Sequence, residues 1–457
     1  MVSFALLVGL FSVFTLQEFI EENHTLLLTQ KEFEEGTFQQ YKDRTEHLYI
    51  QQGITDTGVS TFKGWSVLAT VNIAGSVKTI GKYSFSNCPV LTSVVIGNGV
   101  ETIGAFAFLY CIKLADIVLP STVKTIENNA FQYCNQLKTV TLGDGVKTIG
   151  NFAFANCIKL SQISLPNSLT SLGNSAFQSC TDLLRVTFGT GITTIGSSAF
   201  YQCWKLTKIE IPDSVTTIDP STFYSCCNLE VVTIGGKVQT IGDEAFRTCN
   251  KLSNITLPNS VKSIGDGVFY NCFSLSEVNM GDSLERIGHN AFRCCFSLYN
   301  LTLPNSLLTI GDYSFMACFG LSNLVIGENV TSIGVLAFSY TSNLQCIYFN
   351  GLTEPVIASN AFDGALATKV MTPSGYKQNE FGQLQVAKGE IIEECSETVV
   401  VEDKDTNVYL IIGLNIALVV VIVVVGIIIY LLRRKSDGSL NTAVLYTKDG
   451  ALNTGMV

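Results

Sequence analysis

Hydrophobic and polar positions follow a pattern along most of this chain that returns every 23 residues. In the unit that starts at Leu137, Val140 and Leu142 alternate with Thr139 and Thr141. This period of two is typical of a strand with one buried face. The unit recurs without insertion or deletion, and a fixed period of this length indicates a solenoid.

Each unit also carries a phenylalanine and a leucine at fixed positions, and most carry an Ile-Gly step, with the variants Ile126-Glu127, Leu172-Gly173 and Ile218-Asp219. The phenylalanine column runs from Phe62 to Phe338 and the leucine column from Leu68 to Leu344. After the strand we expect a return segment with a short helical turn, in which Gly150 provides a tight bend and a phenylalanine fills the interior. One unit cannot bury its apolar face alone, so neighbouring units stabilise each other.

These patterns predict an α/β-type solenoid with a parallel β-sheet face over residues 57–381, which include a C-terminal cap. About thirteen units, stacked at about 4.8 Å each, give a rod of roughly 60 Å. Residues 17–56 are expected to form an N-terminal cap region, and residues 382–408 an acidic juxtamembrane stalk.

Residues 409–432 are almost entirely apolar and predict a single transmembrane helix. At about 1.5 Å per residue they span roughly 36 Å, enough to cross a bilayer with some tilt. Arg433, Arg434 and Lys435 follow directly, whereas acidic residues precede the segment. The positive-inside rule then places the tail, residues 433–457, in the cytoplasm and the repeats outside, as in a type I plasma-membrane protein. A buried core helix is the alternative.

Residues 1–16 resemble a secretory signal peptide because their apolar core, Phe4 to Leu16, has the length of such a region. The preceding residues lack Lys and Arg, and no clear small-residue cleavage site follows. An uncleaved apolar leader is therefore the alternative to a cleaved signal.

Charge is unevenly distributed along the chain. Residues 17–50 contain eight acids and three bases, and residues 382–408 contain seven and two. Residues 51–381 contain 21 acids and 19 bases, so the repeats are nearly neutral. The absence of a basic face in the sequence argues against nucleic acids and heparin-like polyanions as partners.

The repeated spacing L-x-x-V/I-x-L/I-P/G…V-x-x-I-G-x-x-A-F-x-x-C, as at Ala176-Phe177 and Ala199-Phe200, resembles the BspA-like (Treponema pallidum-type) leucine-rich repeats. Residues 370–381 look like the cap that often ends such arrays. With the membrane segment and tail, the layout resembles BspA-like surface proteins of parasitic protists such as trichomonads. The resemblance implies cell-surface display and binding, often to host proteins or cells, and it carries no catalytic residues.

Eleven cysteines occupy one column, which suggests a metal site, a nucleophile, disulfides between units or buried free thiols. Metal sites need paired ligands in a loop, and a nucleophile needs a nearby base, whereas the only histidines are His24, His47 and His289. Parallel side chains on stacked units point alongside one another, so we favour buried free thiols. The column comprises Cys88, Cys111, Cys134, Cys157, Cys180, Cys203, Cys226, Cys249, Cys272, Cys295 and Cys318.

Outside the column, Cys395 lies in the expected stalk, where it either links two chains or stays unpaired. Four Asn-x-Ser/Thr sequons lie in the expected exterior. Asn254, Asn300 and Asn329 are the candidate N-glycosylation sites, and Asn23 lies near the leader.

The outward strand positions are the expected binding surface, although a solvated face without a partner is the alternative for any one residue. Arg185, Lys208 and Glu210 form its most charged central patch.

The first hypothesis is a non-catalytic surface protein that binds an extracellular protein or cell-surface ligand, such as host matrix or a host cell. The second is a signalling or endocytic receptor that uses the short tail. An ectoenzyme involving His289 is the third. No cofactor, metal or catalytic residue is expected.

Overall fold

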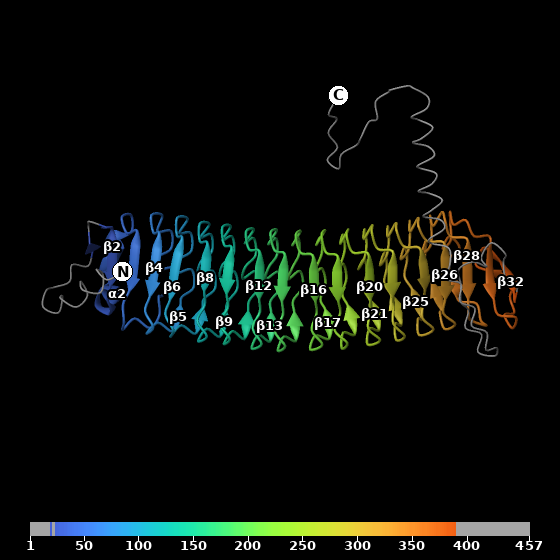
Figure 1. The fold of residues 1–457 in the computed structure, drawn as a ribbon, viewed down its shortest axis with the longest axis horizontal. Coiled ribbons are helices and arrows are strands. Elements are labelled where there is room, and N and C mark those ends of the chain that lie inside the picture. The colour runs from blue at the N-terminus through green and yellow to red at the C-terminus, as the bar shows by residue number, and fades with distance from the viewer. Residues whose placement is uncertain (1–18, 21–22, 390–457) are drawn as a thin grey trace, which may run out of the picture. The chain divides into compact units, whose positions relative to one another are not determined.

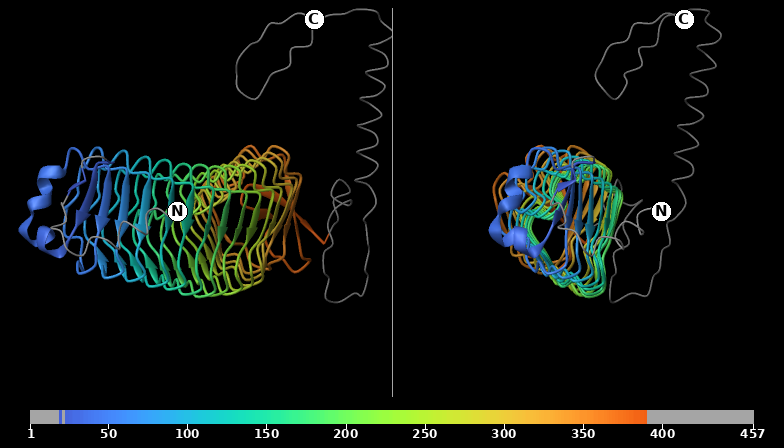
Figure 2. Two further views of the ribbon diagram at one scale, coloured as in Figure 1. Left: turned by 60° about the vertical axis from the view of Figure 1, so that its left-hand side comes forward. Right: turned by 90° about the vertical axis from the view of Figure 1, so that its left-hand side faces the viewer.

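The repeats form one elongated stack of rungs, seen in a computed structural model that describes residues 19–20 and 23–389 (Figure 1). These residues belong to a compact unit that runs from Met1 to Cys395. Rungs follow one another along the stack in sequence order, so sequence neighbours at a spacing of 23 are also spatial neighbours. Two rows of strands run along it, with turns between them (Figure 2).

The first row, which we call the broad face, contains the longer strands. Their starts are spaced by 23 residues from His47 to Lys369, and neighbours pair in parallel, residue against equivalent residue, as at Val140↔Ile117. The strands are β2 (Thr25–Leu28), β3 (His47–Ile50), β4 (Thr70–Ile73), β6 (Ser93–Ile96), β8 (Asp116–Val118), β10 (Thr139–Thr141), β12 (Gln162–Ser164), β14 (Arg185–Thr187), β16 (Lys208–Glu210), β18 (Val231–Thr233), β20 (Asn254–Thr256), β22 (Glu277–Asn279), β24 (Asn300–Thr302), β26 (Asn323–Ile326), β28 (Cys346–Phe349), β30 (Lys369–Thr372) and β32 (Leu384–Lys388).

The second row, which we call the narrow face, consists of two-residue strands that precede the Gly of each Ile-Gly step. They form two parallel sheets, one from β5 to β15 and one from β17 to β29. The strands are β5 (Thr79–Ile80), β7 (Thr102–Ile103), β9 (Thr125–Ile126), β11 (Thr148–Ile149), β13 (Ser171–Leu172), β15 (Thr194–Ile195), β17 (Thr217–Ile218), β19 (Thr240–Ile241), β21 (Ser263–Ile264), β23 (Arg286–Ile287), β25 (Thr309–Ile310), β27 (Ser332–Ile333) and β29 (Val356–Ile357).

The return segment is not helical, contrary to the expected short helical turn. In the rung of Cys157, the N–H groups of Phe152, Phe154 and Asn156 donate to carbonyls of the next rung at 2.8–2.9 Å. The intervening N–H groups of Ala153 and Ala155 donate three residues back within the rung. A helix is excluded because every second N–H is used between rungs and because two residues per rung are left-handed, here with φ of 56° and 61°.

The interior is a continuous apolar core in which equivalent side chains stack on one another. The Phe154 ring is fully buried and lies nearly parallel to the rings of Phe131 and Phe177, at centroid distances of 5.2 and 5.3 Å. The same stacking runs from Phe62 to Phe362. Because each ring packs against its equivalents, burial is shared between rungs, as the sequence predicts.

Glycine at the Ile-Gly step permits close approach of rungs rather than a special backbone angle. A Cβ added to Gly150 would lie 2.7 Å from the backbone nitrogen of Asn128 in the preceding rung. This distance is too short for a Cβ, so a larger residue at Gly150 would force the neighbouring backbones apart, although two other rungs carry Glu127 and Asp219 at the equivalent position. The expected tight bend is thus better described as a contact between neighbouring backbones.

Both ends of the stack differ from its middle. At the start, β1 (Phe19–Ile20) pairs antiparallel with β2, and α2 (Gln30–Glu35) and the 3-10 helix η2 (Thr37–Tyr41) precede β3. Thr29 and Glu32 form a capping box that begins α2. At the other end, β31 (Glu380–Phe381) pairs antiparallel with β32. The broad face therefore extends past residues 57–381 in both directions.

The predicted leader, most of the predicted stalk, the predicted transmembrane segment 409–432 and the tail lie outside the described residues. Within residues 19–20 and 23–389, no helix has the length and apolar character needed to span a bilayer.

Candidate functional site

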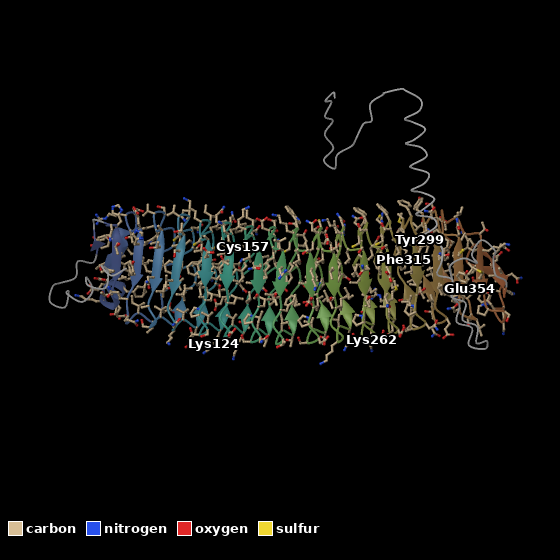
Figure 3. The ribbon with its side chains drawn as sticks, viewed as in Figure 1. Lys124, Cys157, Lys262, Tyr299, Phe315 and Glu354 are labelled. Carbon is tan, nitrogen blue, oxygen red and sulfur yellow. The ribbon has the colours of Figure 1, made fainter. Side chains whose placement is uncertain are left out.

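The outer side of the broad face is a continuous, mostly polar surface that runs along the repeats. Along each strand, one residue points into the core and its two neighbours point outward, as in β16, where Ile209 is buried between exposed Lys208 and Glu210. Outward residues of successive strands therefore form two rows along the stack. The rows are exposed from β6 to β24, and Figure 3 shows side chains along the whole stack.

The structure places the three predicted binding residues together on this outer side. Arg185 of β14 pairs in register with Lys208 of β16, so their side chains are neighbours in one row. The Lys208 Nζ lies 2.5 Å from Glu210 Oε1, and both side chains are more than half exposed. An ion pair this exposed contributes little to stability, so these charges are available for a partner.

A second charge cluster borders the same strands. The Asp182 carboxylate lies between two lysines, 2.7 Å from Lys205 Nζ and 3.3 Å from Lys159 Nζ. The hydrogen bond from Lys205, supported by Lys159, lowers the pKa of Asp182 below its ordinary value. Two cations thus share one acid, which leaves a local excess of positive charge.

Three exposed apolar side chains lie among these charges, and sequence reasoning did not single them out. Leu184 precedes β14, Trp204 lies in the turn before β16, and Val231 begins β18. Each is about half exposed, at 49%, 48% and 48%. The sequence does show Leu184 and Val231 as exceptions, because most other rungs carry a polar residue at the equivalent positions.

Two candidate glycosylation sites lie on the same outer side. Asn254 and Asn300 are exposed first residues of β20 and β24, and Asn329 lies in an exposed turn. The Asn254 amide donates to Ser253 Oγ at 3.2 Å, and that of Asn329 donates to the Asn305 carbonyl at 2.8 Å. All three are on the surface, as a sequon requires. Their occupancy remains a prediction.

Toward the C-terminal end of the stack, the outward residues of the broad face become buried. Asn323, Cys346 and Met371 are buried although they occupy outward rows, and Tyr348 packs with the last two. Cys346 is disulfide-bonded. The open part of the broad face is therefore bounded, and the predicted residues lie near its centre. The prediction for Cys395 concerns a residue outside the described part.

The cysteine column consists of buried free thiols, which confirms the favoured interpretation. Cys157 Sγ donates to the carbonyl of Phe131 in the preceding rung at 3.3 Å, and each column member makes the equivalent bond. Burial raises the pKa of these thiols, to about 12 for Cys180, so they stay protonated and unreactive. Among the described residues, no group of three or more His, Cys, Asp or Glu side chains is arranged to hold a metal.

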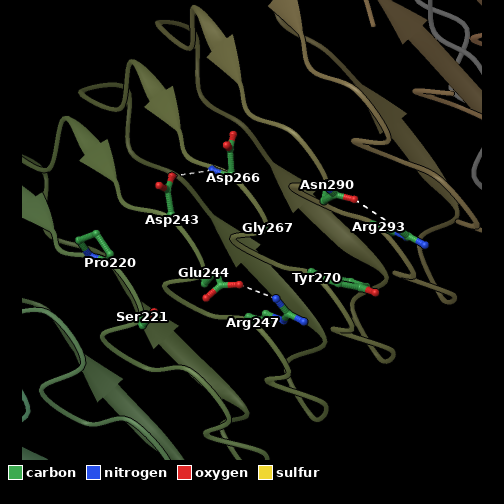
Figure 4. Close-up of a pocket in the computed structure, with 10 residues that line it drawn as sticks. All are labelled: Pro220, Ser221, Asp243, Glu244, Arg247, Asp266, Gly267, Tyr270, Asn290 and Arg293. Atoms are coloured by element: carbon green, nitrogen blue, oxygen red, sulfur yellow. Dashed lines mark hydrogen bonds and ion pairs between the residues drawn. The ribbon is translucent and has the colours of Figure 1, made fainter. Parts of the chain in front are cut away.

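A groove of about 560 Å³ lies on the return side, over four consecutive rungs (Figure 4). Arg247 lies over the rings of Tyr224 and Tyr270, at 5.5 and 4.5 Å, and forms an ion pair with Glu244. Arg293 covers the other side of Tyr270 at 5.4 Å. Both faces of Tyr270 are therefore occupied by guanidinium groups, and this stack stabilises neighbouring rungs through cation–π contacts.

His24 and His47 lie in adjacent rungs at the start of the stack, where the His47 N–H donates to the His24 carbonyl at 3.2 Å, whereas His289 lies far along the described chain. His24 contacts Glu46, His47 contacts Thr70, and His289 Nδ1 accepts the Asp312 N–H at 3.0 Å. His289 occupies a position where Asp266 and Asp312 make the same kind of bond to the next rung. His289 therefore caps a backbone N–H of the next rung.

The parallel strands, the 23-residue period and the stacked phenylalanines define a leucine-rich repeat solenoid. Comparison with protein families gives a match to the BspA type Leucine rich repeat region, in six copies over residues 31–160, 101–230, 147–272 and 239–369. The matched residues make up most of the chain, which therefore belongs to the BspA-type leucine-rich repeat family.

One solved structure agrees with this assignment, and a second resembles this chain in sequence identity alone. A leucine-rich repeat protein from Bacteroides ovatus is 30% identical, with a TM-score of 0.63, over 76% of this chain and 84% of that one. The leucine-rich repeat protein TpLRR of T. pallidum is 31% identical over 40% of this chain and 83% of its own, with a TM-score of 0.33. A comparison with curated proteins gives no significant match.

Proposed function

We propose that this chain is a non-catalytic cell-surface protein that mediates adhesion to host proteins or cells through the outer side of its broad face. The observation that carries the proposal is the open, ordered surface from β6 to β24, whose outward residues change from rung to rung around the cluster of Arg185, Lys208 and Glu210. Solenoid surfaces of this kind commonly serve recognition, and proteins of the BspA-type family are usually exposed at cell surfaces.

The remaining segments fit display at a plasma membrane. Residues 1–16 would direct export, residues 409–432 would span the bilayer once, and the basic residues after them would keep the tail in the cytoplasm. Glycans at Asn254, Asn300 and Asn329 would then face the exterior with the repeats. The chain would be a type I single-pass protein whose repeats reach the ligand from an acidic stalk.

Surface display of the full chain tests the adhesion function. Cells that lack the protein are made to express residues 1–457 and are applied to epithelial monolayers and to a coat of basement-membrane extract. Saturable attachment above that of the parent cells is the expected result. A chain that is folded and displayed, yet gives no attachment to either surface, would overturn the proposal.

Deletion of residues 436–457, which keeps the basic residues 433–435 that set the topology, separates adhesion from the receptor hypothesis. Attachment should persist without the tail, because the outer side of the broad face remains intact. If attachment persists but ligand-dependent uptake or signalling disappears, the receptor function is added to adhesion. Antibody labelling of intact cells, before and after permeabilisation, checks that the repeats lie outside and the tail inside.

A further inference from the structure

An exposed apolar cluster lies at the centre of the broad face. Leu184 precedes β14, Trp204 lies in the turn before β16 and Val231 begins β18, so they accompany three successive strands of the broad face, and about half of each side chain is accessible. By contrast, the inward residues of the same strands, such as Ile209, are nearly fully buried. Exposed apolar side chains that lie singly need no explanation, but three along successive strands form a local patch.

The charges around this cluster are mostly positive. In the rungs from Lys159 to Lys251, this side of the molecule carries five bases and three acids. The bases are Lys159, Arg185, Lys205, Lys208 and Lys251, and the acids are Asp182, Glu210 and Glu230. The whole of residues 51–381 has a small net negative charge, so this part of the surface has the opposite sign.

The excess positive charge is centred on Arg185. Lys208 is paired with Glu210, Lys251 with Glu230, and both Lys159 and Lys205 with Asp182. Arg185 makes no ion pair within 4 Å among the described residues. It lies between Leu184 in sequence and Lys208 across the ladder. An unpaired, exposed guanidinium beside accessible apolar groups is the composition found at protein-binding hot spots.

We propose that these residues form a docking site for a folded protein partner that presents an apolar side chain surrounded by acidic groups. We call it the central patch, and it consists of Leu184, Arg185, Trp204, Lys205, Lys208 and Val231. The proposal rests on the proposed function and specifies its partner. The positive charges of the central patch favour a partner whose surrounding surface is acidic. The exposed Trp204 and Leu184 favour a partner with an apolar side chain at the centre of that surface.

A protein fits this surface better than a sulfated polysaccharide. The basic residues do not form an uninterrupted row, because Asp182, Glu210 and Glu230 lie among them. A polyanion would meet these carboxylates at each rung and would leave Leu184 and Trp204 without partners. A protein surface with separate acidic and apolar groups matches both features.

Two kinds of substitution test the central patch in the full chain displayed on cells. Trp204→Ala and Leu184→Ser should each weaken attachment to epithelial monolayers by about tenfold or more, because central apolar contacts dominate binding. Arg185→Glu should weaken it by about tenfold and should also reduce its dependence on salt, because rim charges steer association. Arg185→Lys should restore most of the attachment, since the charge returns.

Matched positions on the same face provide the controls. Val118→Ser removes an apolar side chain that is 63% exposed in β8, and Glu277→Arg changes the charge in β22 at the position equivalent to Arg185. Both should leave attachment within about twofold of the parent. All substituted residues are exposed, so surface labelling and thermal unfolding should match the parent.

A new sequon gives an independent test of the same site. Lys208→Asn with Glu210→Thr creates in β16 the Asn-Ile-Thr sequence that the chain already has at the equivalent place in β20. A glycan there should abolish attachment by covering the central patch. The same kind of sequon placed in β22, by Glu277→Asn with Asn279→Thr, should not.

Each outcome has a distinct meaning. If the parent chain does not attach, the adhesion function itself fails. If the parent attaches and the central-patch variants attach equally well, the adhesion function stands and the central patch is overturned. Protease treatment of the monolayer should remove attachment, and enzymes that remove sulfated polysaccharides should not. The reverse result would replace the protein partner by a polysaccharide and overturn the proposal.

Discussion

The two sides of the broad face follow opposite rules although they belong to the same strands. The inward side repeats aliphatic residues in one column, so that Ile163, Val186 and Ile209 are buried equivalents in successive strands. The outward row changes at nearly every step, from Gln162 to Arg185 to Lys208. The register depends only on the inward columns, and the outer side is therefore free to vary without loss of the fold. This difference teaches that stability and recognition are carried by different residues of one strand.

The largest effect is expected at alkaline pH, which should lower the free energy of unfolding through the buried cysteine column. Burial raises the pKa of each column thiol from its ordinary value of 9.0, to about 12 for Cys180 and Cys272. Above about pH 9 the unfolded chain loses these protons and the folded chain keeps them, so the free energy of unfolding falls as pH rises. The loss approaches ~1.4 kcal/mol per pH unit for each thiol at pH values where the unfolded chain has lost the proton and the folded chain has kept it.

Denaturant titrations followed by circular dichroism between pH 8 and 11 measure this slope. Tyrosines and lysines also titrate in this range, so the control is a variant with Cys157→Ala and Cys180→Ala. Its slope should be smaller by about 3 kcal/mol per pH unit, whatever its stability at neutral pH. An identical slope in parent and variant would show that the thiols are not the groups responsible.

Truncation of one phenylalanine ring in the core should lower the free energy of unfolding more than any single change on the outer side of the broad face. Phe154→Ala removes a fully buried ring that stacks on two neighbours and should lower the free energy of unfolding by about 3–5 kcal/mol. Thr141→Ala, on the exposed side of β10, should change it by less than about 0.5 kcal/mol. Comparable losses of unfolding free energy in the two variants would contradict the idea that core residues, and not outer residues, carry the stability.

A smaller effect is expected at the left-handed positions of the return segment. Gly267 has φ of 61° at a place where most rungs carry a larger residue, such as Ser221 or Glu244. A Cβ at Gly267 would meet only side-chain atoms at 3.6 Å or more, so Gly267→Ala should cost about 1 kcal/mol of backbone strain. Thermal unfolding measures it, with Ser221→Gly as the reciprocal variant, which should not be destabilising by more than a few tenths of a kcal/mol.

The period and the alternation in each strand predict the broad face, its inward columns and the outward direction of Arg185, Lys208 and Glu210. The return segment was not predictable in this way. Its left-handed residues include Phe106 and Phe152, which carry no preference for positive φ, because hydrogen bonds to neighbouring rungs impose the conformation. The apolar part of the central patch was not predictable from the period, because Leu184 and Val231 stand in columns that are polar in most rungs and Trp204 lies in a turn outside the strands.

The antiparallel pairs at both ends of the stack have a consequence for assembly. Hydrogen bonding between rungs runs along both faces and the return segment, so an uncovered terminal rung would offer a template on which another chain adds in register. The β1–β2 and β31–β32 pairs reverse the strand direction at these two places. A rod with parallel edges would offer such a template at both ends, and these two reversals remove it from the ends of the described stack.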